Sequence, residues 1–360
     1  MKRVKENFQK PHILIIGAGI IGKFNALELS RIGYQVTIAD PAQYKNSSNA
    51  ALGLLMGNIY QKRSGRSWML RKESIELWPN WIQFLQKFNQ DLHIEKPLIQ
   101  LTTNEERFEK LTKFAKQNAK QDLEVLENDS VFIKNIDKIF KTNNLKGIIS
   151  YRDGRIDPKS LLRTLDIFIE NKEVNFIKDE IIKIEKYNSQ WVSTTKNFDE
   201  IKSEAIILCN SLNALKLINN RPNNIQLKPV LGQAMEIYAD EKGIDFLSLP
   251  RHFNINGKNI LPITKNRIII GSTDEYNINP NKNFFENLTD FLENKPKWLT
   301  KERVSKKWFG IRSRPEGEAS PILRNLKERL ILCTGFYKNG ILLAPACSRW
   351  VLNELKKEFD

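Results

Sequence analysis

A glycine-rich turn near the start of the chain has the composition of a phosphate-binding loop. Residues 17–22 read Gly-Ala-Gly-Ile-Ile-Gly and separate the apolar run His12–Ile16 from a segment with apolar residues at helical spacing. In such a turn the first glycine permits the sharp bend, the second lets the backbone approach a diphosphate, and the third lets the helix pack against the strand. The helix N-terminus adds free N–H groups and the positive end of its dipole. The residues expected to hold the phosphates are Gly17, Ala18, Gly19, Ile20, Ile21 and Gly22.

An acidic residue stands where a bound dinucleotide would need a hydrogen-bond acceptor. Asp40 follows the apolar run Gln35–Ala39, and its carboxylate can accept hydrogen bonds from the ribose of an adenosine. Strand, glycine turn, helix, strand and acid therefore come in the order of a dinucleotide-binding unit. The pattern does not distinguish NAD from FAD, although its position at the N-terminus favours FAD.

A second helix that is predicted to begin at a glycine lies near the end of the chain. Residues 332–345 read Leu-Cys-Thr-Gly-Phe-Tyr-Lys-Asn-Gly-Ile-Leu-Leu-Ala-Pro, so a buried strand ends, a polar turn follows, and an apolar helix begins at Gly340. The N-terminus of a helix aimed at a flavin offers N–H groups to the N1–C2=O edge, which carries the negative charge of the reduced ring. The alternative for this segment is an ordinary strand-to-helix turn in the core.

The elements that must position these turns can be predicted from the spacing of apolar residues. Short apolar runs are typical of buried parallel strands, and Asp157-Pro158 has the residue types of a helix N-cap and first position. Strands are expected at 12–16, 35–39, 174–177, 181–186, 191–195, 205–209, 229–238, 259–263, 267–271 and 330–334, and helices from residue 20 to near Gly33, at 66–89 and 104–119, from residue 157, and at 340–355.

Strand–helix units at both ends of the chain, with strand-rich material between them, predict an α/β fold. We expect a Rossmann-like nucleotide-binding domain assembled from discontinuous segments, with an inserted α+β substrate domain that has a mainly antiparallel sheet. The first domain is predicted to comprise residues 1–85, 150–215 and 310–360, and the second residues 86–149 and 216–309.

Composition narrows the classes of partner. The 360 residues carry a net charge of +15, but the lysines are scattered, so a solvated basic surface is expected and no nucleic-acid partner.

Cys209, Cys333 and Cys347 lack metal-ligand spacing and lie in apolar runs, which predicts no metal site and a cytoplasmic, reducing location. The polar first residues are neither a secretory signal nor a membrane span, so no integral membrane segment is expected. No repeat or coiled-coil pattern sets the oligomeric state, which leaves a homo-oligomer open.

The run from Thr334 to Pro345 resembles the C-terminal flavin motif of glycine oxidases, in the D-amino acid oxidase superfamily. Further segments resemble that family in chain order, at 47–53 (Ser-Ser-Asn-Ala-Ala-Leu-Gly), 153–158, Ile181, 229–233 and 310–312. The resemblance implies FAD as the non-covalent cofactor. Besides the phosphate turn and Asp40, it implies FAD contacts from Ser47, Ser48, Ala50, Gly53, Ile181, Gly310, Lys338, Asn339, Gly340, Ile341 and Leu342.

The resemblance also implies a chemistry, in which a hydride passes from the α-carbon of a neutral amine to flavin N5. The protein must then orient that carbon, hold the carboxylate and exclude water, and no side-chain base is required. The presence of only three histidines agrees with this expectation. Arg312 is predicted to bind the substrate carboxylate, because its planar fork can hold both oxygens. The alternative is a surface arginine paired with Glu316 or Glu318.

Two departures from the family pattern concern the substrate. Lys338 stands where glycine oxidases carry an arginine that helps to bind substrate, and Asn259 stands where they carry a tyrosine. Both are retained as predicted substrate-binding residues, but glycine, sarcosine, a D-amino acid and a cyclic imino acid all remain open. Ile269 stands where related sarcosine oxidases place a lysine linked to oxygen activation, so rapid reoxidation by O₂ is not assured.

Four functions therefore stay under consideration. The first is an amino-acid oxidase that passes electrons to O₂, and the second is a dehydrogenase of the same fold that passes them to a quinone. A third is an FAD-binding homologue that has lost catalysis, which the residues at Asn259 and Lys338 would support. The fourth, an NAD-dependent dehydrogenase, leaves the helix that begins at Gly340 unexplained.

Overall fold

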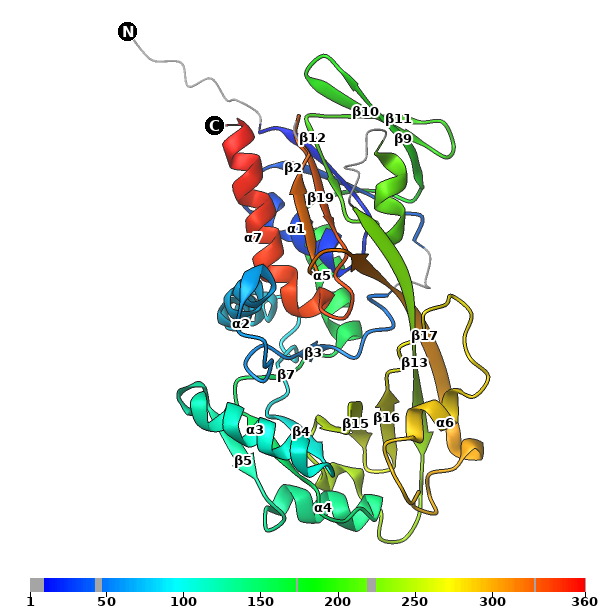
Figure 1. Ribbon diagram of the computed structural model, residues 1–360. Helices are drawn as coiled ribbons and strands as arrows, with labels where there is room; N and C mark the ends of the chain where they lie inside the picture. Colours follow the sequence, from blue (N-terminus) through cyan, green and yellow to red (C-terminus); the bar gives the residue numbers. More distant parts are fainter. Residues whose placement is uncertain (1–9, 43–46, 173, 219–224, 327, 360) are drawn as a thin grey trace.

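The fold is built on two large sheets, which lie toward opposite ends of the molecule (Figure 1). The computed structural model describes residues 10–42, 47–172, 174–218, 225–326 and 328–359. The first nine residues, for which neither a signal nor a membrane span is expected, lie outside that part of the chain.

The first sheet has six strands and is parallel except at one edge. Along β1 the side chains alternate, with Ile13 and Ile15 facing one core cluster and Leu14 and Ile16 facing another. Both faces are therefore covered, which explains why these strands are nearly continuous apolar runs. The strand order is β18 (Ile322–Asn325), β19 (Leu330–Thr334), β12 (Ala205–Leu208), β1 (His12–Ile16), β2 (Gln35–Ala39) and β8 (Asn175–Ile177).

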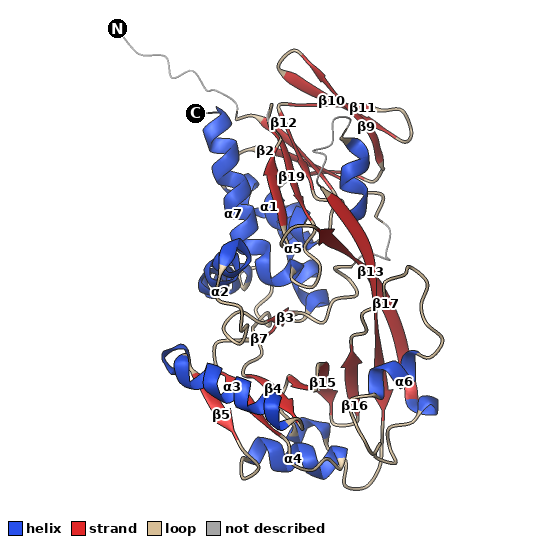
Figure 2. Cartoon of the chain, viewed as in Figure 1, coloured by secondary structure: helices blue, strands red, loops and turns tan. Residues whose placement is uncertain are grey.

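Helices cover one face of this sheet and a small sheet covers the other (Figure 2). Helix α1 joins β1 to β2 and packs against both α5 and α7. Asp157 caps α5 by accepting a hydrogen bond from the backbone N–H of Ser160, as predicted. The helices on this face are α1 (Ile20–Arg31), α2 (Gly65–Leu85), α5 (Pro158–Asn171) and α7 (Gly340–Phe359), and the small sheet comprises β9 (Ile181–Tyr187), β10 (Gln190–Thr195) and β11 (Glu200–Ser203).

The second large sheet has eight strands, and its neighbours are antiparallel except for β14 with β4. Side chains again alternate between the two faces of the sheet, because Leu98 packs against α3 while Ile99 packs toward α4. The strand order is β17 (Val304–Glu316), β13 (Gln226–Tyr238), β16 (Arg267–Gly271), β15 (Lys258–Thr264), β14 (Phe253–Ile255), β4 (Leu98–Thr102), β6 (Lys146–Ser150) and β5 (Leu123–Leu126), with α3 (Glu105–Gln117), α4 (Val131–Phe140) and α6 (Phe284–Thr289) as its helices.

The fold class predicted from the sequence is confirmed, since a Rossmann-like parallel sheet built from separated segments accompanies a mainly antiparallel sheet. The division at residues 85, 149, 215 and 309 remains a prediction. The shorter elements complete the chain: β3 (Leu54–Leu55), β7 (Gly154–Arg155), η1 (Ala119–Gln121), η2 (Ser211–Leu217), η3 (Phe246–Ser248) and η4 (Lys301–Arg303).

A buried carboxylate joins the segment that follows β6 to the segment that follows β3. Asp153 is fully buried, and its oxygens accept hydrogen bonds from the backbone N–H groups of Gly57 and Asn58, both at 2.8 Å, and of Ile59 at 2.6 Å. Burial raises the pKa of Asp153, while these hydrogen bonds oppose the rise. The side chain of Asp153 therefore satisfies three backbone donors that would otherwise be buried without partners.

Replacing Asp153 by alanine should lower the free energy of unfolding by about 3 kcal/mol, because it removes the acceptor of several buried donors. Urea denaturation followed by circular dichroism measures the change. Asp129→Ala is the matched control, since Asp129 is exposed, and it should change stability by less than about 0.5 kcal/mol. Equal stabilities of the two variants would contradict the role assigned to Asp153.

Candidate active site

The two helices whose starts were predicted from glycines, α1 and α7, begin at one cavity. This cavity of about 480 Å³ is lined by residues from the N-termini of both α1 and α7 and by residues from both large sheets. The sequence-predicted residues that line it are Gly17, Gly19, Ile20, Ile21, Asp40, Ser47, Ser48, Ala50, Gly53, Ile181, Asn259, Gly310, Arg312, Lys338, Gly340 and Ile341. Four predicted cofactor residues, Ala18, Gly22, Asn339 and Leu342, are not among its lining residues.

The glycines of the first turn are required by close packing. Gly17 has a φ of +107°, and a Cβ there would lie 2.8 Å from the carbonyl carbon of Cys209, the residue that follows β12. A Cβ on Gly22 would overlap the carbonyl oxygen of Gly17. Gly22 therefore lets α1 approach β1 without itself reaching the cavity, in agreement with the packing role predicted for the third glycine.

Two polar side chains stand at the N-terminus of α1. The hydroxyl of Ser48 accepts a hydrogen bond of 3.0 Å from the backbone N–H of Ile20. The carboxylate of Asp40 accepts one of 2.8 Å from the N–H of Ala18 and one of 2.7 Å from the N–H of Ala42. Asp40 is thus held beside the turn from the end of β2, while Ala18 faces Asp40 through its backbone.

Side chains of α2 form hydrogen bonds to residues at the start of α7. The amide oxygen of Asn339 accepts a hydrogen bond of 2.8 Å from Arg71, whose guanidinium lies 3.9 Å from the ring centroid of Tyr60. The carbonyl oxygen of Leu342 accepts a hydrogen bond of 3.1 Å from the indole N–H of Trp78. Asn339 and Leu342 therefore position the helix start, and Gly340 and Ile341 line the cavity.

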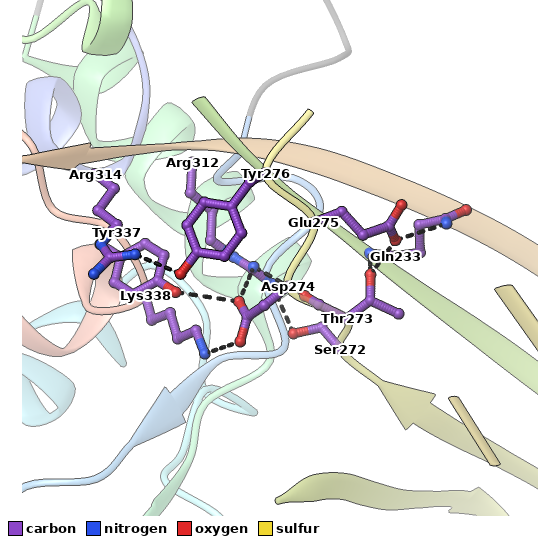
Figure 3. Close-up of polar contacts among 10 residues, drawn as sticks. All are labelled: Gln233, Ser272, Thr273, Asp274, Glu275, Tyr276, Arg312, Arg314, Tyr337 and Lys338. Atoms are coloured by element: carbon purple, nitrogen blue, oxygen red, sulfur yellow. Dashed lines mark hydrogen bonds and ion pairs between the residues drawn. The ribbon is translucent and has the colours of Figure 1, made fainter. Parts of the chain in front are cut away.

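Arg312 reaches the cavity from β17 across the neighbouring strand β13. A Cβ on Gly232 would overlap its guanidinium, so glycine at that position makes the passage possible. Nη1 donates to the carbonyl oxygen of Thr273 at 3.1 Å and to the carboxylate of Asp274 at 2.9 Å, and Nη2 donates to the hydroxyl of Ser272 at 2.7 Å (Figure 3). Burial lowers the pKa of Arg312, and the nearby Asp274 opposes that shift.

The alternative pairing of Arg312 with Glu316 or Glu318 is wrong. Glu316 forms an ion pair with Lys228, and Glu318 forms one with Arg324 at 2.6 Å. The guanidinium of Arg312 instead meets Asp274, a residue that follows the end of β16.

Asp274 is a residue of the cavity that sequence reasoning did not identify. Besides Arg312, its carboxylate forms an ion pair with Lys338 and accepts a hydrogen bond of 3.3 Å from the hydroxyl of Tyr337 (Figure 3). Burial, together with the charge of Asp274, raises the pKa of Tyr337 to about 12, so this phenol stays protonated and can donate. The sequence feature that could have indicated Asp274 is the polar run directly after the predicted strand Arg267–Gly271.

The rim beside Asp274 combines aromatic and basic side chains. Tyr276 is 67% exposed, and its hydroxyl accepts a hydrogen bond from Arg314. The guanidinium of Arg314 lies 5.4 Å from the ring centroid of Tyr276 and 5.6 Å from that of Tyr337. Arg314 therefore adjoins the network of Arg312 and Asp274 through the ring of Tyr337, whose hydroxyl donates to Asp274.

Asn259 lines the cavity from β15 and contacts a buried histidine. Its amide oxygen accepts hydrogen bonds from Asn254 at 3.1 Å and from Nε2 of His252 at 3.3 Å. His252 is fully buried, and desolvation lowers its pKa from 6.5 to about 3, so the imidazole is neutral. Substrate binding by Asn259 remains a prediction.

In the described part of the chain, no cluster of His, Cys, Asp or Glu side chains could hold a metal ion. Within the same residues, no helix has the length and apolar character needed to cross a membrane. Cys333 and Cys347 are buried, and all three cysteines are free thiols, as expected for small core residues.

The chain resembles known flavoproteins in sequence. Residues 12–353 match the family model DAO, described as FAD dependent oxidoreductase. A glycine oxidase of Bacillus licheniformis is 22% identical over 356 residues, which cover 92% of this chain and 89% of that protein. The "tRNA 5-methylaminomethyl-2-thiouridine biosynthesis bifunctional protein MnmC" of Leptospira interrogans is 27% identical over 308 residues. That match covers 82% of this chain but only 45% of the MnmC protein, so the chain spans less than half its length.

The fold agrees with solved structures of low sequence identity. Glycine oxidase from Bacillus cereus superimposes with a TM-score of 0.82 at 21% identity, covering 97% of this chain and 96% of that one. The FAD-bound L-alpha-glycerophosphate oxidase from Mycoplasma pneumoniae has a TM-score of 0.80 at 17% identity, covering 97% and 95%. At these identities the likeness concerns the fold alone.

His252 leads to a pH-dependent stability prediction. The pKa of His252 is about 3 in the folded protein, below its ordinary value of 6.5. Between these two values, His252 therefore binds a proton in the unfolded chain but not in the folded one. The free energy of unfolding should therefore fall with decreasing pH, by up to about 1.4 kcal/mol per unit. Urea denaturation between about pH 7 and about pH 5 measures this loss.

The matched variants are His252→Gln and His93→Gln, the second at an exposed histidine. The extra loss of stability at low pH should disappear in His252→Gln and persist in His93→Gln. The same pH dependence in wild type and His252→Gln would show that another group causes it.

Proposed function

Because the chain belongs to the family of FAD dependent oxidoreductases, we propose that it oxidises a small amino acid or secondary amine. It would take a hydride from the carbon beside the amine, as a glycine oxidase-like enzyme. The observation that carries the proposal is that the N-termini of α1 and α7 and the guanidinium of Arg312 all lie at one cavity. Such a cavity can hold a long nucleotide and a small carboxylate together.

The residues at the cavity fit FAD. Neither α1 nor α7 has an acidic residue in its first turn, so no residue of either first turn repels a bound anion. The carboxylate of Asp40, which lies beside the α1 turn, accepts hydrogen bonds from the N–H groups of Ala18 and Ala42. Gly17 and Gly19 of the first turn line the cavity, where a diphosphate could approach their backbone. We assign the diphosphate to the α1 turn, the ribose to Asp40, the adenine to Ile181, and the flavin to the start of α7.

On the substrate side, this chain's residues would hold and orient the amine. When bound, FAD supplies the hydride acceptor, flavin N5. Arg312 would bind the carboxylate with its fork, and Lys338 would add a second positive charge. His252 stays neutral, and its Nε2–H donates to Asn259; His252 is not among the residues that line the cavity. Orientation and exclusion of water would therefore be the protein's main contributions.

A second candidate is an amine carried on tRNA. Its support is the similarity to MnmC, whose name places it in tRNA modification, together with the net charge of +15. The glycine oxidase matches favour a small free amine, because they cover about nine-tenths of both proteins. Anaerobic bleaching of the flavin by total tRNA, but by no free amine, would decide for the second candidate. The acceptor, O₂ or a quinone, would be assigned by peroxide formation in air.

Arg312→Ala tests the proposed substrate site. We expect the wild type to be bleached anaerobically by at least one of glycine, sarcosine, D-alanine or L-proline. The variant should keep its FAD, yet its reduction rate at low substrate should fall at least about 30-fold, because one side of a buried charge pair is lost. Stopped-flow absorbance of the flavin measures the rate.

Lys306→Ala is the control, since Lys306 is an exposed cation on the same strand, and its rate should stay within about twofold of the wild type. Unchanged reduction in Arg312→Ala would remove Arg312 from the site. A wild type that no amine reduces would contradict the proposed reaction itself.

A further inference from the structure

The guanidinium proposed to bind the substrate carboxylate already holds a carboxylate of the protein. Asp274 accepts a hydrogen bond of 2.9 Å from Nη1 of Arg312 and pairs with the ammonium group of Lys338 through its other oxygen (Figure 3). Both cations expected to attract a substrate carboxylate therefore converge on one acidic side chain. A substrate anion and Asp274 cannot occupy the same donors at the same time.

The backbone around Asp274 is fixed by contacts that do not involve its side chain. Leu231 and Glu275 exchange two backbone hydrogen bonds, of 2.8 and 2.9 Å, which attach the segment to β13. The N–H of Thr273 donates to the carbonyl oxygen of Gln233 at 3.1 Å, and the N–H of Gln233 donates to the hydroxyl of Thr273 at 2.9 Å. The segment thus remains anchored whether or not residue 274 carries a charge.

The neighbouring acid, Glu275, cannot replace Asp274. Its carboxylate accepts hydrogen bonds from the side chains of Gln233 and Thr273 and from the N–H of Asn281, on the side away from Arg312 (Figure 3). The side chain of Asp274 is 37% exposed, whereas that of Arg312 is 14% exposed. Asp274 can therefore turn toward solvent when another anion takes its place, while Arg312 stays in the cavity.

We propose that Asp274 is a specificity-determining residue, because a substrate carboxylate can bind Arg312 and Lys338 only in exchange for the carboxylate of Asp274. This inference rests on the proposed function. The substrate gains little net electrostatic attraction from this exchange, because its carboxylate only replaces that of Asp274. Substrates whose binding depends on the carboxylate alone are therefore disfavoured.

The test is the affinity of the FAD-loaded enzyme for acetate, a carboxylate without an amine, measured by isothermal titration calorimetry. Asp274→Asn keeps the side-chain shape and removes the competing charge, so acetate should bind at least tenfold more tightly than to the wild type. Asp274→Ala should show the same direction, which guards against a defect of one variant. Asp240→Asn removes an exposed acid that is not among the residues lining the cavity, and it should leave acetate affinity unchanged within twofold.

A double-mutant cycle assigns the effect to Arg312. The tenfold gain should be lost when Asp274→Asn is combined with Arg312→Ala. Unchanged or weaker acetate binding in both Asp274 variants would overturn the inference, as would a gain that persists without Arg312. Since acetate binding needs no turnover, a failure of the proposed amine oxidation would be seen separately, in the absence of flavin bleaching by amines.

Discussion

The structure depends on one constraint, that two helices from opposite ends of the chain begin at the same edge of the parallel sheet. β1 and β19 both pair in parallel with β12, so their carboxyl ends lie on one side. Each of these strands is followed by a helix that starts with or just after a glycine, and the two helices pack against each other. The positive ends of two helix dipoles are thereby directed at one cavity, which suits an extended anionic nucleotide.

The antiparallel sheet supplies the remaining wall of the cavity through its longest strands. β13 and β17 pair over most of their length, which sets Gly232 beside the side chain of Arg312. The segment after β16 is attached to β13 and carries Asp274 to the same guanidinium. At the end of the cavity proposed to bind substrate, Asp274 therefore offsets one of the two positive charges of Arg312 and Lys338. A further carboxylate would compete with Asp274 for these donors.

Local patterns were enough to predict the two helix starts at the cavity, but not the contacts around Arg312. The glycine turns and the strands that precede them are defined by short-range spacing, and β19 and the start of α7 lie where the sequence predicts. Asp274 was missed because its role depends on contacts with Arg312 and Lys338, which lie far along the chain and meet it only through strand register. β17 was not predicted as a strand, since charged residues interrupt its apolar pattern. Asn339 and Leu342 are held by α2, which no local pattern indicates.

The most direct measurement of the central claim is a crystal structure of the enzyme with FAD bound. The prediction is a single FAD that extends through the cavity, with its diphosphate at the N–H groups that begin α1 and its isoalloxazine ring at the N-terminus of α7. A flavin ring distant from Gly340, or an FAD whose diphosphate does not approach Gly19, would contradict the convergence of the two helices on one nucleotide.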